Sequence, residues 1–586
     1  MCGISLIVSN DKNSLDKIGQ MNAKVIHRGP DAQGVFQNDI LALGHTRLSI
    51  IDLDERSNQP FVLDEYVMSY NGEIYNYREL RKELEDCGYT FKTSSDTEVV
   101  LRAYQHWKSE CFSKFNGMWA LVIFNKESHE VLLSRDRYGI KPLFFYQDED
   151  LFLAGSELKQ FEIFSQTQDV NYDKVYNFIV NSLVDYDSET FYKNINSLSP
   201  GSFLILDAEK KDFTSKYYYK LMSERSSTKS VEELLQKSIT LRLRSDVPIG
   251  TCLSGGIDSS LIAILAREKI PSGDKFIGIH GKSTEKASDE SEYAKIISFE
   301  NNIDLKIIEP ISEDFLEDIE LAIETQDEPF LSSSILMQFN VMKEASENRL
   351  KVLLDGQGAD EIFLGYTRYL ISAIWESSLK FRWISTYKLV RGYLKNNSFY
   401  SFAKLLASAH FRKIILILKM FETLKVKKTF KSEQKKMFFW KTKKFSNYDI
   451  LTGSLASLLR YEDRNSMYFS IETRLPFLDF ELVEKGLSLD VNQKINGAFT
   501  KSPLREILGK YTKTGINLRT DKIGFASPEK TWINENESTM NQLIKSSNLL
   551  NELFLFKKEI SYENYRMFYW RLFIVAIWEK KKGIKT

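Results

Sequence analysis

The chain has 586 residues, of which 43% are hydrophobic and 27% charged, and its formal net charge is −1. This length predicts several domains with sizeable cores, and the composition excludes a disordered or collagen-like chain. A charge near zero gives no reason to expect nucleic acid as a partner, and four cysteines are too few for a disulfide framework, which favours a reducing compartment.

Targeting signals are not evident. Residues 1–20 lack the basic and apolar regions of a signal peptide, and no apolar run approaches the roughly 18 residues of a membrane span. The longest apolar candidates, Ile414–Leu418 and Leu572–Trp578, are much shorter. We therefore expect a cytoplasmic protein without a transmembrane segment.

The first 200 residues are rich in short apolar segments separated by Asn, Asp and Gly, which is typical of strands. The predicted strands are Leu41–Leu43, Val67–Tyr70, Ala120–Phe124, Val131–Ser134 and Leu143–Tyr146. Helical periodicity appears at Tyr77–Cys87 and Asp96–Trp107. Many strands with a few helices indicate a layered α+β domain.

The pattern changes after a polar, Ser-rich segment, Lys220–Ser230, which we interpret as a linker. Helices and strands then alternate, as they do in a parallel α/β sheet. The predicted elements are a helix at Val231–Leu243, a strand ending in Thr251–Leu253, a helix from Asp258, a strand at Lys275–His280 and a helix from Asp289.

Residues 371–450 differ in charge from the rest of the chain. They contain 18 Lys and Arg, 4 Asp and Glu, and 16 aromatic residues, so this window carries +14 and the remainder −15. We interpret it as a helical insertion with a basic solvated face and an aromatic core face. The alternative is a docking surface for an acidic partner or an anionic membrane surface.

The first candidate for a catalytic residue is Cys2, in the sequence Met1-Cys2-Gly3. Removal of Met1 would leave Cys2 with both a thiol and a free α-amine, a nucleophile and a potential base on one residue. A thiol that attacks an amide needs donors for the developing oxyanion, and Asn71 with the Gly72 N–H could supply them. A free amino-acid substrate needs its charged groups held, which Arg47 and Asp96 could do.

These residues lie in segments that resemble the class II glutamine amidotransferase domain. The matching segments are MCGI, HRGPD, HTRLSIID, NGEIYNY, SSDTEV, NGMWA, SRDRYGIKPL and GSELK, all within residues 1–215. The resemblance implies an αββα sandwich of the N-terminal-nucleophile type and a thioester on Cys2. It also implies Asn71 and Gly72 as the oxyanion hole, and Arg47, Asn71, Gly72, Glu73 and Asp96 as glutamine contacts.

A second site is indicated by Cys252–Ser260, where an apolar strand meets a helix through the sequence SGGIDSS. Such a Gly-rich turn lets backbone N–H groups approach an anion at a helix N-terminus, although it lacks the Gly-Lys-Ser/Thr of a Walker motif. It resembles the pyrophosphate loop of ATP pyrophosphatases, which split ATP between its α and β phosphates. Asp258 would help to hold Mg²⁺ there.

Further segments extend this resemblance to the synthetase domain of the glutamine-hydrolysing asparagine synthetases, over residues 228–586. They are the strand and glycine turn Lys351–Phe363, then Leu459–Asp479 and Thr500–Arg505. The resemblance implies ATP contacts at Leu253, Ser254, Gly255, Gly256, Asp258, Ser259, Gly278, Asp355 and Gly356. Lys501 would stabilise charge on the phosphates, and Asp360 would be a second Mg²⁺ ligand, although a helix N-cap explains an Asp there equally well.

One departure concerns the acceptor. The best-known asparagine synthetases have Ser-Gly-Glu-Gly where this chain has Asp355-Gly356-Gln357-Gly358, and Gln cannot act as a base. Related bacterial proteins of this large family carry such a Gln, including some in surface-polysaccharide pathways. We therefore expect a glutamine-dependent amidotransferase that uses ATP and Mg²⁺, with aspartate as the first candidate acceptor. A sugar acid of a surface polysaccharide is the alternative, and a non-enzymatic scaffold is a more distant one. A β-lactam-forming relative is disfavoured because Cys2 is present, and a homodimer is a family-level expectation.

Overall fold

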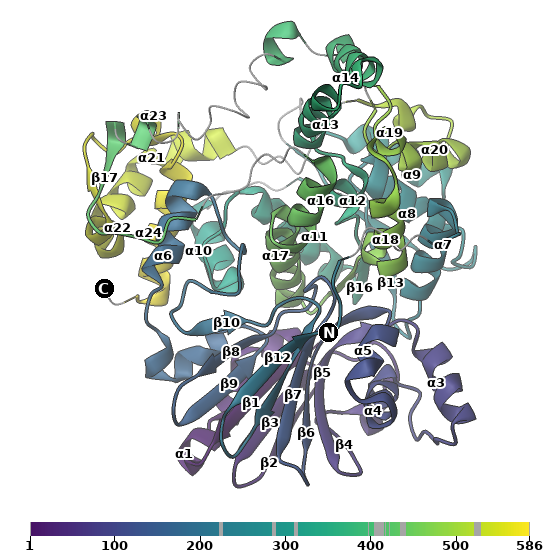
Figure 1. Ribbon diagram of the computed structural model, residues 1–586, viewed down its shortest axis with the longest axis vertical. Coiled ribbons are helices and arrows are strands. Elements are labelled where there is room, and N and C mark those ends of the chain that lie inside the picture. The colour runs from purple at the N-terminus through teal and green to yellow at the C-terminus, as the bar shows by residue number, and fades with distance from the viewer. Residues whose placement is uncertain are drawn as a thin grey trace.

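The computed structural model describes residues 2–221, 227–283, 289–309, 315–396, 398–402, 415, 418–420, 422–433, 441–497, 499–520 and 529–584. Two six-stranded antiparallel sheets form the N-terminal part, and a parallel sheet surrounded by helices forms the C-terminal part (Figure 1). The predicted combination of an α+β and an α/β part is thus confirmed.

The first N-terminal sheet has the order β10-β8-β9-β1-β3-β2 and the second β12-β11-β7-β6-β5-β4. Strands of the first are β1 (Gly3–Ser9), β2 (Ala32–Gln37), β3 (Leu41–Arg47), β8 (Phe144–Gln147), β9 (Leu151–Gly155) and β10 (Ile195–Ser197). Strands of the second are β4 (Phe61–Leu63), β5 (Tyr66–Ile74), β6 (Gly117–Asn125), β7 (Glu130–Arg135), β11 (Ser202–Asp207) and β12 (Phe213–Tyr217).

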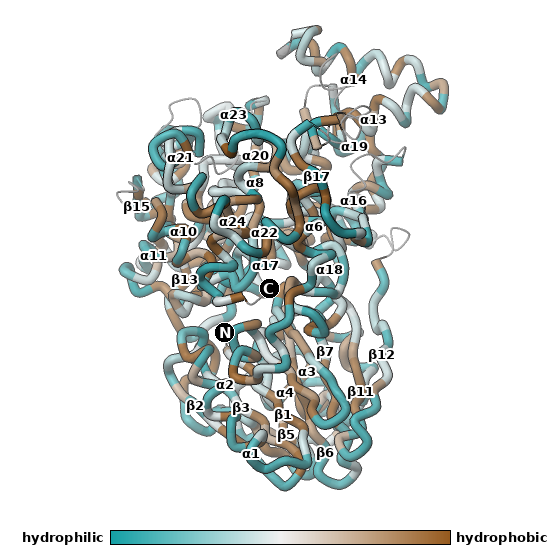
Figure 2. The backbone as a smooth tube through the Cα atoms, turned by 90° about the vertical axis from the view of Figure 1, so that its left-hand side faces the viewer, coloured by the Kyte–Doolittle hydropathy of each residue, from teal (hydrophilic) through white to brown (hydrophobic). Residues whose placement is uncertain are grey.

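Both faces of these sheets are covered, which explains why their central strands are apolar throughout. In β1, Ile4, Leu6 and Val8 point between the two sheets, whereas Ile7 belongs to the core under α1 (Lys12–Leu15) and α2 (Ile18–Lys24). The outer face of the second sheet packs against α3 (Tyr77–Asp86) and α4 (Asp96–Trp107). The result is the expected αββα sandwich, and its central strands are mostly brown in Figure 2.

The C-terminal sheet is parallel throughout, with the order β15-β14-β13-β16-β18. Its strands are β13 (Ile249–Cys252), β14 (Ile277–Gly281), β15 (Asp304–Ile308), β16 (Val352–Leu354) and β18 (Glu472–Arg474). The strand order reverses between β13 and β16. In an open α/β sheet, a crevice for ligands forms at the carboxyl ends of the strands at such a reversal.

Helices cover this sheet and bring its loops together. They include α7 (Val231–Arg242), α8 (Ile257–Arg267), α9 (Ser291–Glu300), α11 (Ser334–Glu347), α12 (Ala359–Phe363), α17 (Ser454–Tyr468), α18 (Phe480–Ser488), α19 (Val491–Lys494) and α20 (Ser502–Tyr511). Helix α8 is buried almost all round, in agreement with its apolar sequence.

A third helical group packs beside the first sheet. It contains α6 (Tyr172–Tyr176), α10 (Phe315–Gln326), α21 (Glu529–Ser546), α22 (Asn548–Leu553), α23 (Tyr562–Tyr565) and α24 (Tyr569–Lys582), with β17 (Leu424–Val426) paired to β19 (Phe554–Phe556). The apolar run Leu572–Trp578 is the buried centre of α24. Among the described residues no helix combines the length and the hydropathy that crossing a bilayer would need. The other apolar run, Ile414–Leu418, lies partly outside them.

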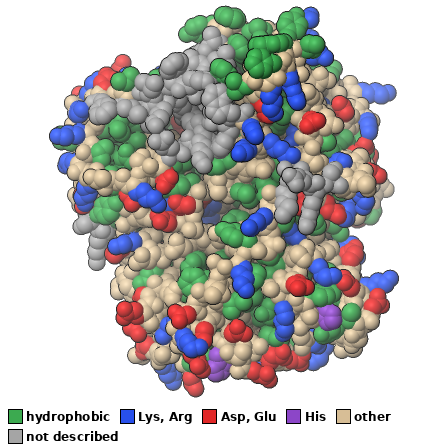
Figure 3. Space-filling model, viewed as in Figure 1, with side chains coloured by type: hydrophobic (Ala, Val, Ile, Leu, Met, Phe, Trp, Pro, Cys, Tyr) green, Lys and Arg blue, Asp and Glu red, His purple; other side chains and the backbone are tan. Residues whose placement is uncertain are grey.

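The described part of the 371–450 insertion is mostly helical, as predicted. It includes α13 (Thr367–Leu379), α14 (Trp383–Asn396) and α16 (Thr442–Leu451) together with the strand β17, whereas residues 397, 403–414, 416–417, 421 and 434–440 lie outside the described residues. Helices α13 and α14 pack together at the end of the molecule away from the N-terminal sheets (Figures 1 and 2). Hydrophobic side chains gather on the surface there, with Lys and Arg beside them (Figure 3).

Candidate active sites

Cys2 lies at the start of β1 and is held from two sides. Its backbone N–H donates to Asn71 Oδ1 at 3.0 Å, and its carbonyl accepts a hydrogen bond from Arg28 Nε at 3.0 Å. The residue is 7% exposed, and this burial raises the pKa of its thiol. The predicted nucleophile is therefore fixed in position and sheltered from water.

Asn71 presents an unused donor beside Cys2. Its Oδ1 is occupied by the Cys2 N–H, while its Nδ2 is buried and has no hydrogen-bond partner among the described residues. Strand β4 pairs with β5 only as far as Met68, so no strand in the described part of the chain covers the β5 edge at Asn71 and Gly72. A Cβ on Gly72 would lie 2.2 Å from the Met118 carbonyl oxygen, so this position requires glycine. A buried, unpaired N–H donor suits an anion that forms only during reaction.

Arg47 ends β3, where the adjoining loop orients its guanidinium. The guanidinium donates to the carbonyls of Asp52 and Asp54, at 2.5 and 2.9 Å, and to Asn58 Oδ1 at 2.8 Å. Arg47 is 5% exposed, and its charge acts on the Cys2 thiol. The structure thus places this predicted carboxylate-binding group next to the nucleophile.

Two acidic side chains complete the predicted glutamine site. Asp96, the first residue of α4, accepts hydrogen bonds from Tyr70 Oη at 2.8 Å and from the Ile74 N–H at 3.0 Å. Burial raises the pKa of Asp96 to about 6. Glu73 is buried as well, and its Oε2 has no hydrogen-bond partner among the described residues. Burial, with the nearby charges of Asp96 and Glu472, raises the pKa of Glu73 far above its usual value.

A buried arginine that the sequence reasoning missed connects this site to the C-terminal part. Arg28 lies 2.6 Å from Glu157 and makes two contacts with Asp463 on α17, at 2.9 and 3.1 Å. All three side chains are at most 3% exposed. The only sequence signal was the charge of Arg28 in HRGPD and of Asp463 in RYEDRNSM. One guanidinium therefore binds the carbonyl of Cys2 and a carboxylate of the other domain.

Other buried polar contacts also cross between the domains. Arg474 Nη2 on β18 lies 3.7 Å from Glu73 Oε1, and Asn116 Nδ2 donates to Asp479 Oδ2 at 2.8 Å. Lys141 Nζ lies 3.9 Å from Asp463 and has no hydrogen-bond partner among the described residues. Buried charges are costly unless they are paired, so the relative placement of the two domains is tightly specified.

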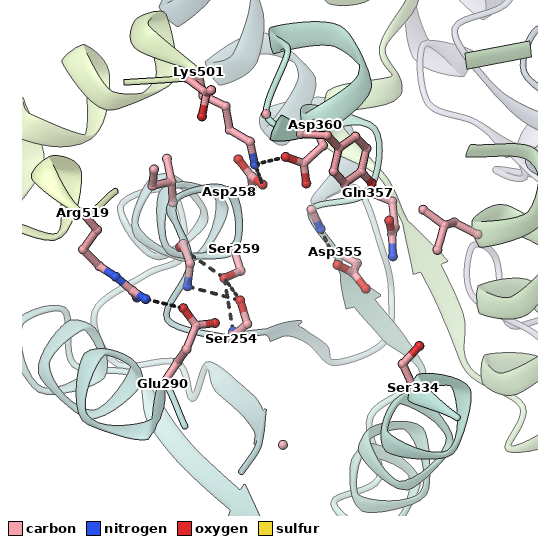
Figure 4. A pocket seen from close by; sticks show the side chains of 18 of the residues that line it. Ser254, Asp258, Ser259, Glu290, Ser334, Asp355, Gln357, Asp360, Lys501 and Arg519 are labelled. Carbon is pink, nitrogen blue, oxygen red and sulfur yellow. Dashed lines mark hydrogen bonds and ion pairs between the residues drawn. The ribbon is translucent and has the colours of Figure 1, made fainter. Parts of the chain in front are cut away.

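The second site is a cavity of about 410 Å³ at the carboxyl ends of β13, β14 and β16 (Figure 4). It lies at the reversal of strand order, where a ligand crevice is expected. Its lining includes Ser254, Gly256, Asp258, Ser259, His280, Gly281, Glu290, Asp355, Gly356, Gln357, Asp360, Tyr366, Lys501, Arg505 and Arg519.

The turn between β13 and α8 is braced by its own serines. Ser254 Oγ and Ser259 Oγ are 2.8 Å apart, and Ser254 Oγ also accepts from the Gly256 N–H at 3.2 Å. Gly255 has φ +82°, and a Cβ there would lie 2.9 Å from the Glu290 carbonyl oxygen. The turn therefore directs the N-terminus of the 11-residue helix α8 toward the cavity. A helix N-terminus in this position favours the binding of anions.

Lys501, Asp258 and Asp360 converge from three elements (Figure 4). Lys501 Nζ forms ion pairs with Asp258 Oδ2 and, at 2.7 Å, with Asp360 Oδ1. Burial would lower the pKa of Lys501, but the two carboxylates outweigh it and raise that pKa. A Cβ on Gly365 would lie 1.8 Å from Asp360 Oδ1 and 2.2 Å from Lys501 Cε, so glycine leaves the room for this convergence.

The positions of Asp258 and Asp360 show whether this site could hold Mg²⁺. Because one ammonium nitrogen contacts both carboxylates, an oxygen of Asp258 and an oxygen of Asp360 approach a common point. Among the described residues no group of three or more His, Cys, Asp or Glu is placed to hold a metal. Two carboxylates fit Mg²⁺ in nucleotide sites, where phosphates and water supply the remaining ligands.

The remaining sequence predictions for this site fall into two groups. Ser254, Gly256, Asp258, Ser259, Asp355, Gly356 and Lys501 line the cavity, whereas Leu253, Gly255 and Gly278 do not. Gly278 lies within β14 opposite Thr251, and it is His280 and Gly281, further along this strand, that reach the cavity. His280 Nδ1 donates to the Leu253 carbonyl at 2.9 Å and so supports the turn.

Arg519 is a second lining residue that sequence reasoning missed. Its Nη2 lies 2.7 Å from Glu290 Oε1, its Nη1 donates to the Gly255 carbonyl at 3.2 Å, and its guanidinium lies 3.9 Å from the Tyr293 ring centroid. No sequence motif marked it. It places a cation against the pyrophosphate-type turn, from a segment more than 250 residues further along the chain.

Comparison with known proteins assigns both halves of the chain. Residues 1–219 match the family model of a glutamine amidotransferase domain, and residues 230–566 match that of asparagine synthase. Asparagine synthetase [glutamine-hydrolyzing] 1 of Bacillus subtilis is 31% identical over 560 residues, covering 90% of this chain and 87% of that protein. A putative asparagine synthetase [glutamine-hydrolyzing] 2 of Methanocaldococcus jannaschii is 34% identical over 403 residues, covering 63% and 76%.

A solved structure of the allosteric regulatory enzyme of purine biosynthesis aligns with a TM-score of 0.30 and 16% identity, covering 52% of this chain and 80% of that one. A TM-score of this size says nothing further about either site. The two family models and the extended match to the B. subtilis protein are decisive. The chain belongs to the family of glutamine-hydrolysing asparagine synthetases, ATP-dependent ligases that take nitrogen from glutamine.

Proposed function

We propose that this enzyme hydrolyses glutamine at Cys2 and transfers the ammonia internally to an adenylated carboxylate in the C-terminal cavity, with aspartate as the acceptor and asparagine as the product. The observation that carries the proposal is the pair of sites in one chain. Cys2 lies beside the unpaired Asn71 amide, and Lys501 lies between two carboxylates beside the Ser254–Ser259 turn.

At the first site, removal of Met1 makes the Cys2 nitrogen an α-amine, held by Asn71 Oδ1. The thiol attacks the glutamine carboxamide carbon, and the proton it loses passes by way of this amine to the leaving nitrogen. Asn71 Nδ2 and the Gly72 N–H stabilise the oxyanion. Ammonia leaves, and water then hydrolyses the thioester to glutamate.

Substrate selection at this site uses the charged residues around Cys2. Arg47 binds the α-carboxylate of glutamine, and Asp96 and Glu73 bind its α-ammonium group. A bound ammonium favours the ionised carboxylates, which reverses the effect of burial on their pKa values. Binding of the correct substrate therefore compensates charges that are unfavourable in the ligand-free protein.

At the second site, the acceptor carboxylate attacks the α-phosphorus of ATP and pyrophosphate leaves. The α8 N-terminus and Lys501 offset the phosphate charge. Asp258 and Asp360 would hold Mg²⁺, which when bound neutralises further phosphate charge. Ammonia then attacks the acyl carbon of the adenylate, and AMP leaves with the electron pair of the broken C–O bond.

Internal transfer of ammonia is proposed because solvent at neutral pH would protonate it and remove its nucleophilicity. The interface between the two sites is buried, and it is spanned by Arg28, Asp463, Glu73 and Arg474. This arrangement supports transfer within the protein rather than through bulk water.

A second acceptor class is favoured by Gln357. This residue lines the cavity at the position where the best-known asparagine synthetases carry Glu, and its amide cannot accept a proton as a base. Amidation of another carboxylate, such as a sugar acid of a surface polysaccharide, is therefore the competing proposal.

An acceptor screen distinguishes the two. Pyrophosphate release from ATP is measured with glutamine, with and without aspartate, and then with sugar acids in place of aspartate. Aspartate-dependent release together with asparagine formation is the expected result. Glutaminase activity with no response to aspartate but with a response to a sugar acid would replace aspartate as the acceptor and retain the reaction class.

A further inference from the structure

The outer surface of α14 is unusually hydrophobic for a helix at the periphery. Among the described residues, nine large hydrophobic side chains are more than 60% exposed, and six of them lie between residues 381 and 400. These six, called the α14 patch below, are Phe381, Trp383, Ile384, Tyr387, Phe399 and Tyr400, with exposures of 62–76%. Exposed apolar residues elsewhere are scattered, whereas a contiguous patch marks an interaction surface.

This arrangement is the reverse of the one expected for an aromatic core face. The inner side of α14 packs Leu389 against the cluster that also contains Leu370 and Phe402, and Val390, which is half-buried, lies at the edge of this contact. Trp383, Ile384 and Tyr387 lie on the side away from Leu389 and are more than 60% exposed. Since the helix already has a core-facing stripe, the patch is a second apolar surface that folding leaves uncovered.

Basic residues share that outer surface. Lys388, Arg391 and Lys395 are exposed on α14, and they form no ion pair within the part of the chain that the structure describes. Arg382 is exposed at the start of the helix as well. The segment 381–396 therefore carries four exposed cations and no acidic residue. Aromatic residues next to unpaired cations favour an anionic partner with an apolar interior.

We propose that the α14 patch docks the enzyme onto an anionic lipid membrane surface, with α14 lying in the plane of the interface. Trp383, Ile384 and Tyr387 enter the boundary between headgroups and acyl chains, while Lys388 and Arg391 contact lipid phosphates. Figures 1 and 2 place α14 at the outer end of the molecule, so the body of the enzyme does not obstruct a flat surface there. The charge complementarity favours anionic lipid over the same basic patch on a second copy of this chain.

The test is co-sedimentation of the full-length enzyme with two kinds of vesicle: phosphatidylcholine alone, and phosphatidylcholine with about 30% phosphatidylglycerol. Binding to the anionic vesicles that weakens with added salt is expected. Lys388→Gln/Arg391→Gln should weaken it about 25-fold, since each basic residue near such a surface contributes about fivefold. Trp383→Ser/Ile384→Ser should weaken it about tenfold or more.

Matched controls are available elsewhere on the surface. Phe299→Ser removes an exposed aromatic residue (89% exposed) from α9, and Lys12→Gln/Lys82→Gln removes two exposed charges from the N-terminal part. Neither control should change binding, and glutaminase activity should be retained in every variant, which shows that all of them fold. Vesicle binding is a readout that does not depend on the acceptor or on the proposed function.

Three results would overturn the proposal. The first is absence of binding to anionic vesicles. The second is equal binding to vesicles of phosphatidylcholine alone. The third is a change of sedimentation coefficient in the α14 variants without any vesicle binding, which would make the patch an interface between copies of this chain.

Discussion

The two candidate active sites differ in whether their polar and charged side chains have partners within the protein. At the glutaminase site, polar atoms are buried and left without partners, as Asn71 Nδ2 and Glu73 Oε2 are. At the ATP site, Lys501 pairs with Asp258 and Asp360, and Arg519 pairs with Glu290. Under the function proposed above, the first site has its polar groups in place for one small substrate, whereas the second holds its charges in pairs until a highly charged substrate binds.

This difference follows from what each site must bind. Glutamine is a zwitterion whose reacting amide develops negative charge only in the transition state. Hydrogen-bond donors for that charge can therefore be held in place without a partner in a closed site. ATP brings several negative charges, and a cavity lined by uncompensated cations would be unstable without it. Ion pairs within the cavity, whose cations contact the phosphates once ATP binds, avoid this cost of uncompensated charge in the ATP-free protein.

The largest effect is expected for Cys2→Ala. Glutamine-dependent amide formation should fall to below about 10⁻⁴ of wild type, because no other nucleophile can form the thioester. Activity with ammonium salts should stay close to the wild-type level. Both are measured as pyrophosphate release and amide product. Cys87→Ala is the control, since Cys87 is exposed. Survival of glutamine use in Cys2→Ala would show that the two sites are not divided as described.

Lys501→Met should impair the C-terminal site and leave the glutaminase site active, the opposite of Cys2→Ala. We expect a loss of about 10²–10³-fold in amide formation with either nitrogen source, because charge on the phosphates loses its main side-chain donor. Glutamine hydrolysis measured without ATP should persist. Lys510→Met, on the exposed end of the same helix α20, is the matched control. A parallel loss of both activities would instead indicate that Lys501 supports the fold of the whole chain.

The connection between the sites is tested by Arg28→Leu. Removing this guanidinium leaves Asp463 buried without its main partner and takes one of several cations from buried Glu157, which should lower the free energy of unfolding by about 3–5 kcal/mol. The midpoint of thermal unfolding reports the change. Lys210→Leu, which breaks an exposed pair with Asp207, should leave the midpoint almost unchanged. Equal shifts in the two variants would argue against a special role for the buried contact.

The smallest effect is a pH dependence of glutamine binding. Burial raises the pKa of Asp96 to about 6, and only the ionised carboxylate attracts the ammonium group of glutamine. KM for glutamine should therefore rise about tenfold per unit below pH 6. Because the pKa of Asp355 is also raised to about 6, the glutaminase reaction must be measured alone.

Asp96→Asn provides the comparison for that profile. It should raise KM at neutral pH and remove the dependence below pH 6, since no titrating carboxyl is left at that position. A KM that rises with acid equally in the variant would assign the titration to another group, with Glu73 as the first candidate.

Much of this protein could be predicted from local sequence. Alternating and continuous apolar segments identified the strands, and α3, α4 and α7 begin at the predicted residues, because the period of apolar positions reflects which faces are covered. The motifs around Cys2 and Ser254 led to both expected reactions through their resemblance to known families, and such motifs can be recognised because they are local runs of sequence. Such motifs can be recognised without knowing which distant segments contact them.

The tertiary structure alone decided how the two halves are connected. Arg28 and Asp463 are separated by 435 positions, and Arg519 contacts the turn at Gly255 across 264 positions, so no spacing rule could pair them. The orphaned Nδ2 of Asn71 and the outward face of α14 likewise depend on what other segments cover. Sequence determined which chemical groups the chain carries, while long-range packing determined which of them are paired, buried or left for a ligand, because burial and partnership are properties of the whole fold.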